Sequence, residues 1–120
     1  MRRFSNTFSH MVQLIIKNLK EVETEAQREQ IRKMAEEMQQ KLETRFKRYD
    51  KDLTFEIIVN KSSATYLISA ALDMKSKKVL QAEEGKDPIL TAKKLLDEFF
   101  KQVARQIELE RKDYLYKRKR

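Results

Sequence analysis

A long amphipathic segment near the C-terminus constrains the fold more than any other stretch of the chain. It opens with Asp87 and Pro88, a pair typical of a helix start, because a carboxylate caps free amides and proline lacks an N–H that the first turn leaves unbonded. From Ile89 to about Tyr116 the residues on one side of the predicted helix form an apolar stripe that needs a covering surface. Its members are Ala92, Leu95, Leu96, Phe99, Val103, Gln106 and Ile107.

Four segments of alternating residues predict the strands that supply this surface. They run from Val12 to Lys17, from Leu53 to Val59, from Thr65 to Met74 and from Val79 to Glu84. Polar turns at 60–63 and 75–78 separate the last three strands. Residues 1–10 show no period, so we expect a loose N-terminal arm there.

A second helix is predicted between the first and second strands. Thr24 followed by Gln27 has the spacing of a capping box, and the helix is expected to run to about Tyr49. Its methionines are interpreted as core filling, because they share a stripe with other apolar residues. The stripe consists of Ile31, Met34, Ala35, Met38, Leu42, Phe46 and Tyr49.

The order strand, helix, three strands, helix predicts an α+β fold in two layers. We expect a four-stranded sheet with two long helices packed on one face, because each helix has a single apolar side. A chain of 120 residues fits one domain. The expected organisation is one domain over 11–112 and a basic C-terminal tail over 113–120.

The charge balance points to a polyanionic partner. The chain has 27 Lys and Arg against 19 Asp and Glu, for a net charge of +8. Nucleic acid or an acidic membrane surface fits this charge, and an ordinary basic surface is the alternative. No apolar run approaches the roughly 20 residues of a membrane span. The region before Glu21 lacks acids, as organelle transit peptides do, but its alternation from Val12 favours a strand.

The sequence offers little for catalysis. It has no cysteine, one glycine and one histidine, which excludes disulfides, thiolate metal sites and glycine-rich phosphate loops. The single histidine, His10, lies in the expected arm, where a surface histidine is usually inert. We therefore expect no catalytic residue, no metal, no cofactor and no small-molecule substrate, and no enzyme activity.

Basic side chains line one flank of each predicted helix, which favours RNA binding. Each cation can neutralise a phosphate and release counterions, so such contacts position a protein without reading bases. Solvated helix faces are the alternative. In the C-terminal helix no aromatic residue is interleaved with the row of cations: Phe99 belongs to the core stripe, Phe100 lies beside it, and Tyr114 and Tyr116 fall in the tail. The candidates are Lys94, Lys101, Arg105 and Lys112, then Lys33, Lys41, Arg45 and Arg48, and, towards the end of the chain, Arg111 and Lys117.

Several short motifs resemble those of one known family. They are Val12-Gln13-Leu14, Lys17-Asn18-Leu19 with Glu21 and Val22, Ala82-Glu83-Glu84, and the spacing of Asp87, Asp97 and Gln102. With the element order, they resemble the short form of the ribosome hibernation-promoting factor family, which includes ribosome-associated inhibitors. Two positions depart from it: Ile16 stands where the family usually has glycine, and Glu98 where it often has lysine.

The resemblance implies a cytoplasmic factor that binds rRNA of the small ribosomal subunit. Such a factor occupies the channel for mRNA and tRNA, silences idle ribosomes, and is expected to be monomeric off the ribosome and to avoid membranes. Two alternatives remain open from the residues alone. One is a stand-alone domain for structured RNA, and the other is a protein interaction module that pairs through its long helices.

Overall fold

The computed structural model describes residues 12–47, 49 and 52–118, with side chains up to Lys112. The expected arm at 1–10 lies outside the described residues. The elements are β1 (Val12–Lys17), a short 3-10 helix η1 (Leu19–Glu21), α2 (Glu25–Arg45), β2 (Leu53–Ser62), β3 (Thr65–Asp73), β4 (Lys78–Gly85) and α3 (Pro88–Arg118). This order confirms the predicted α+β class.

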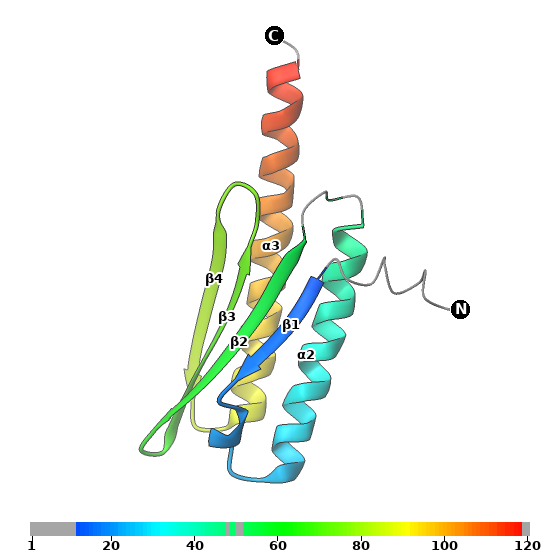
Figure 1. Ribbon diagram of the computed structural model, residues 1–120. Coiled ribbons are helices and arrows are strands. Elements are labelled where there is room, and N and C mark those ends of the chain that lie inside the picture. Colours follow the sequence, from blue (N-terminus) through cyan, green and yellow to red (C-terminus); the bar gives the residue numbers. More distant parts are fainter. Residues whose placement is uncertain (1–11, 48, 50–51, 119–120) are drawn as a thin grey trace, which may run out of the picture.

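The four strands form one mixed sheet in the order β1-β2-β3-β4. β2, β3 and β4 pair antiparallel through short turns, and the first of these turns places Ser63 at a φ of 58°. β1 pairs parallel with β2, with Val12 opposite Leu53, because α2 carries the chain back before β2 begins. Both helices lie on the same side of this sheet, as Figure 1 shows, and the other face is open.

The core lies between the sheet and the two helices. Alternate residues of β2, such as Phe55, point towards the helices, and the apolar stripe of α3 meets them. The rings of Phe55 and Phe99 stack with their centroids 5.3 Å apart. On the open face, Leu67 and Leu80 are 45% and 64% exposed. The core is therefore one-sided, and the outer surfaces of both helices remain available to solvent.

Both helices begin where the capping residues predict. The Thr24 hydroxyl accepts a hydrogen bond from the Gln27 amide at 3.1 Å, and an Asp87 carboxylate oxygen accepts from the Ile89 amide at 2.9 Å. The only glycine of the chain, Gly85, ends β4 immediately before α3. A Cβ at Gly85 would collide with the hydroxyl of Thr91, so this position requires glycine for close packing.

The C-terminal end of α2 was predicted incorrectly. α2 ends at Arg45 rather than near Tyr49. The apolar spacing continues beyond the helix because Phe46 is buried and its ring meets that of Tyr49 edge-on at 4.7 Å. Packing against the core therefore preserved a helical pattern in residues that follow the helix.

The ends of β3 and β4 differ from the sequence prediction by one residue, and two further boundaries differ by more. β2 continues through the polar residues 60–62, because backbone pairing such as Asn60 opposite Leu67 needs no apolar side chain. The backbone of α3 remains helical to Arg118, so most of the expected tail belongs to that helix. The separate role of residues 113–120 stays a prediction.

Candidate nucleic-acid interface

The first predicted set of cations forms a ridge along α3. We call Lys94, Lys101, Arg105 and Lys112 the α3 ridge. At 100° per residue these four side chains leave the helix within a narrow sector, away from the buried stripe. All four are exposed, with the side chains of Lys94 and Lys101 exposed by 73% and 72%. α3 therefore presents positive charge over several turns.

Carboxylates accompany part of this ridge. Lys94 Nζ lies 3.7 Å from a Glu83 oxygen on β4, and Lys101 Nζ lies 3.5 Å from a Glu98 oxygen one turn earlier. These contacts are long and exposed, so each contributes little free energy and leaves the ammonium group accessible. Within the described residues, Arg105 has no carboxylate at ion-pair distance. The ridge is thus partly neutralised in its first half.

The second half of the ridge is less compensated. Lys112, like Arg105, has no ion-pair partner in the part of the chain that the structure describes. Arg111, which was also predicted to contact RNA, pairs with Glu108 at 3.5 Å. The side chain of Lys117 lies outside the described residues, and its contact with RNA stays a prediction.

Two cations of α2 share an aromatic ring of α3. Lys41 Nζ lies 5.6 Å and Arg45 Cζ 5.7 Å from the centroid of the Phe100 ring. We call Lys41, Arg45 and Phe100 the aromatic cation cluster. Neither cation has a carboxylate partner among residues 12–47, 49 and 52–112. Two unpaired positive charges are therefore held together where α2 and α3 meet.

Sequence analysis placed Phe100 beside the core stripe of α3 and did not relate it to the cations of α2. Phe100 follows directly after the buried Phe99. It is half-buried and packs against the core, but its ring also lies under cations of the neighbouring helix. The available signal was the spacing of Lys41 and Arg45, four residues apart, on the flank of α2 that faces α3.

Lys33, another cation of α2 that was predicted to contact RNA, is not part of this cluster. Lys33 is exposed on α2, and no described contact joins it to Lys41 or Arg45. Arg48 lies outside the described residues. The interface that the structure supports thus combines the aromatic cation cluster with the α3 ridge.

A hydrogen-bonded network joins the segment after α2, the β3–β4 turn and α3. We call Tyr49, Ser76, Gln106 and Glu110 the Glu110 latch. The Tyr49 hydroxyl donates to one oxygen of Glu110 at 2.7 Å, and the Ser76 hydroxyl and amide donate to the other at 2.6 and 3.0 Å. The Gln106 amide donates to the Ser76 hydroxyl at 2.6 Å. Sequence analysis missed this network, which fixes the turn against α3.

The latch also sets the ionisation of its carboxylate. Burial alone would raise the pKa of Glu110, but hydrogen bonds from Ser76 and Tyr49 stabilise the charged form and lower that pKa below its ordinary value of 4.5. At neutral pH the carboxylate is therefore charged and engaged by donors of the turn. Its negative charge remains, but its oxygens accept these hydrogen bonds and make no ion pair with the cations of the ridge.

The opposite end of the molecule also contains two lysines that line one hollow, and one of them is paired with a carboxylate. Near the starts of α2 and α3, a hollow of about 550 Å³ is lined by Glu23, Lys61 and Tyr66, among others. The Lys61 ammonium donates to Glu23 at 2.6 Å, which raises the pKa of Lys61 and lowers that of Glu23. This pairing leaves Lys86 as the lysine of the hollow that has no ion pair with a described residue.

The described residues contain no group of three His, Cys, Asp or Glu side chains arranged to hold a metal ion. Among the same residues, none of the helices has the length and hydropathy to cross a bilayer. What the arrangement can do chemically is bind anions over an extended, exposed surface.

Comparison with known proteins places the fold in a specific structural class. No protein-family model matches the chain, and no curated protein sequence matches it. Solved structures do match, and they share the α+β domain in which two helices cover one face of a four-stranded sheet.

Two of these structures illustrate the likeness. One is a ribosomal subunit interface protein from Coxiella burnetii, with 15% identity, 81% of this chain and 97% of that chain covered, and a TM-score of 0.53. The other is the N-terminal domain of Protein Y from Thermus thermophilus, with 18% identity, 78% and 96% covered, and a TM-score of 0.53. The resemblance drawn from the sequence is thereby confirmed at the level of the fold.

Proposed function

We propose that this protein is a ribosome-binding factor of the hibernation type, which inhibits translation by occupying the mRNA and tRNA channel of the small subunit. The observation that carries the proposal is the shared fold with a ribosomal subunit interface protein, which extends over 97% of that protein. The motifs around Asn18, Asp87 and Gln102 support the same family. The shared fold and the sequence motifs are separate observations, and neither depends on the other.

The helix surfaces supply a physical basis for rRNA contact. The α3 ridge and the aromatic cation cluster belong to α3 and α2, the two helices that form the layer on one side of the sheet (Figure 1). Folded rRNA presents closely spaced phosphates, and cations fixed on a rigid domain can neutralise several of them together. Inhibition then requires only occupancy, so no group has to perform catalysis.

Sedimentation with ribosomal subunits tests this proposal. We expect the protein to sediment with small subunits at low salt and to dissociate at high salt. If about 5–8 phosphates are neutralised, the logarithm of the affinity should fall with the logarithm of salt concentration at a slope of about −4.5 to −7. The double variant Lys101→Glu with Arg105→Glu should bind markedly more weakly.

A matched control separates the ridge from overall charge. The double variant Lys20→Glu with Lys86→Glu makes the same change in net charge at two exposed positions outside both helices. It should retain most of the wild-type affinity. Equal loss in both double variants would argue against a defined interface, and tighter binding to duplex RNA than to subunits would favour a stand-alone RNA-binding domain.

A further inference from the structure

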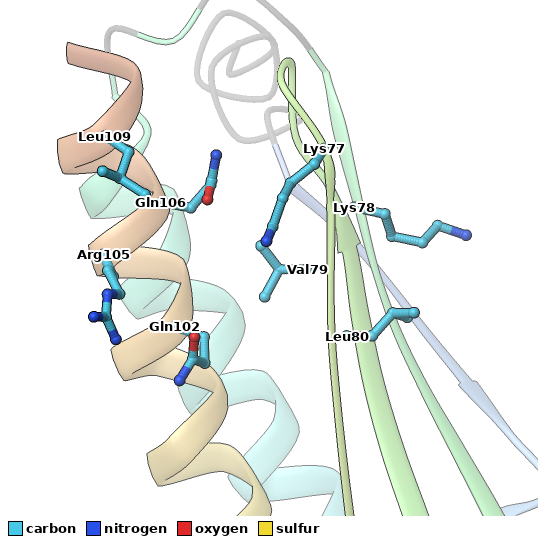
Figure 2. A pocket seen from close by; sticks show the side chains of 8 residues that line it. All are labelled: Lys77, Lys78, Val79, Leu80, Gln102, Arg105, Gln106 and Leu109. Carbon is cyan, nitrogen blue, oxygen red and sulfur yellow. The ribbon is translucent and has the colours of Figure 1, made fainter. Parts of the chain in front are cut away.

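A groove separates the β3–β4 hairpin from the C-terminal half of α3. Its volume is about 370 Å³, within the range of sites that bind small ligands. We call it the hairpin groove. Six of the side chains that line it are Lys77, Val79, Gln102, Arg105, Gln106 and Leu109. Figure 2 shows Lys77 and Gln106 extending into the space between hairpin and helix, whereas Lys78 and Leu80 point away from α3.

Two cations of the groove, one from the hairpin and one from α3, make no ion pair with a described carboxylate. Neither Lys77 nor Arg105 has a carboxylate at ion-pair distance among the described residues. The nearby carboxylate of Glu110 keeps its negative charge, but its oxygens accept hydrogen bonds from Tyr49 and Ser76 and do not pair with these two cations. An anion that enters the groove would therefore meet two free cations, one from each side.

The groove also contains an amide without a partner. Gln102 is half-buried, and its side chain has no hydrogen bond to any described residue. Gln106, one turn later, is only 9% exposed and is held by Ser76. A free glutamine amide offers one acceptor and two donors, which matches the edge of a nucleobase.

An apolar wall completes the groove. Val79 is buried at its base, and Leu109 is 51% exposed at its rim. Aliphatic side chains can cover the face of a planar ring that is removed from water. Cations, an amide and an apolar wall within one groove correspond to the phosphate, base edge and base face of a nucleotide.

The groove is held in shape before any ligand arrives. The turn closes with a hydrogen bond from the Met74 amide to the Lys77 carbonyl at 3.0 Å. The Glu110 latch then fixes Ser76 to α3, so the hairpin cannot move away without breaking three hydrogen bonds to Ser76. A site whose geometry is fixed in advance loses less free energy on binding.

From these contacts we infer that the hairpin groove binds one unstacked nucleotide of an RNA strand, with its phosphate at Lys77 and Arg105 and its base against Gln102 and Leu109. The inference rests on the proposed function for its choice of RNA as the ligand. It goes further by giving the surface a pocket that senses a base in addition to phosphates.

Two probes separate base binding from phosphate binding. We would titrate the full chain with a fluorescent single-stranded RNA hexamer of mixed sequence and with an abasic hexamer of the same length and charge. The wild type should bind the hexamer that carries bases about fivefold more tightly, which corresponds to one well-formed hydrogen-bonded base contact. Equal affinity for both hexamers would overturn the inference.

Variants assign the preference to the groove. Gln102→Leu should abolish the preference for bases and leave the salt slope unchanged, because it removes no charge. Gln102→Glu should weaken both hexamers through repulsion of phosphate. Lys77→Gln should reduce the salt slope by about 1. The exposed helical control Gln40→Leu should behave as the wild type, and retention of the preference in both Gln102 variants would contradict the groove.

Failure of this inference can be distinguished from failure of the proposed function. A wild-type protein that sediments with small subunits but does not distinguish the hexamers would refute the groove alone. A protein that prefers the hexamer with bases but never binds subunits would refute the ribosomal function alone. Amide NMR spectra of each variant would verify that the fold is intact.

Discussion

The two basic surfaces of the helix layer differ in how their charges are compensated. On α3, the first half of the ridge has carboxylates nearby, with Glu83 and Glu98 within 4 Å of lysine ammonium groups. On α2, Lys41 and Arg45 instead lie over the ring of Phe100 and have no described acidic partner. An aromatic ring attracts a cation without cancelling its net charge.

This difference reverses the ranking obtained from the spacing of charges. α3 carries the more regular row of cations, yet α2 carries the two that are both positioned and unneutralised. A phosphate that binds Lys94 competes with Glu83, whereas one that binds Arg45 meets no such competitor among the described residues. A regular row of cations does not ensure that each cation is free of a carboxylate partner. We expect the strongest phosphate contacts from cations that are both held in place and without such a partner.

The largest expected effect comes from the aromatic cation cluster. The double variant Lys41→Gln with Arg45→Gln should reduce affinity for small subunits about 30-fold at physiological salt and lower the salt slope by about 2, because two phosphate contacts are lost. Measurement of sedimentation over a series of salt concentrations gives both values. An unchanged slope would show that these cations make no phosphate contact.

A smaller effect is expected from the compensated half of the α3 ridge. Lys94→Gln with Lys101→Gln removes the same charge but should weaken binding by less than about fivefold, because nearby carboxylates already reduce the potential there. The same salt series measures this variant. A loss equal to that of the α2 pair would remove the distinction between the two surfaces.

The Glu110 latch ties Tyr49 and the β3–β4 turn to α3, and its loss should affect stability. Glu110→Gln leaves one acceptor oxygen for the donors of Tyr49 and Ser76. We expect the unfolding free energy at pH 7 to fall by only about 1 kcal/mol, because Glu110 is partly exposed to solvent. Urea denaturation measures this loss, and Glu108→Gln on the exposed face is the control.

The effect of Glu110 on stability should depend on pH. Its pKa is lowered in the folded protein, so its contribution is complete above the unfolded value near 4.5 and declines as pH falls towards the folded value. Wild type and Glu110→Gln should therefore converge in acid. A difference that stays constant down to pH 3 would mean that ionisation of Glu110 is unimportant.

The smallest expected effect comes from removal of the Phe100 ring. Phe100→Leu keeps an apolar side chain against the core but removes the ring beneath Lys41 and Arg45. Affinity should fall about twofold to threefold with no change in salt slope, because the cations remain but are less well positioned. Phe100→Tyr should restore binding, and failure of that rescue would argue against a role for the ring.

Local features of the fold could be predicted from the sequence, because each depends on neighbouring residues. Thr24 and Asp87 cap their helices through atoms two or three residues away, and alternation in β2 follows directly from burial of one face. The end of α2 could not be predicted in the same way. Tyr49 keeps the helical spacing because it packs against Phe46, outside the helix.

The site was less accessible to sequence analysis than the fold. Glu110 and Ser76 are 34 residues apart, and nothing in either neighbourhood indicates that they meet. Phe100 was predicted to lie at the edge of the core, which is correct, but its cations come from a different helix. Spacing along one element identifies which side chains share a face, whereas contacts between elements require the assembled structure.

The parallel pairing of β1 has a consequence for the order of assembly. β2, β3 and β4 are joined by short turns and can pair soon after they are synthesised, whereas β1 must wait until α2 and β2 exist, since Val12 lies opposite Leu53. We expect β1, the earliest of these four strands along the chain, to be the last to join the sheet. In pulsed hydrogen exchange during refolding, its amides should gain protection after those of β3.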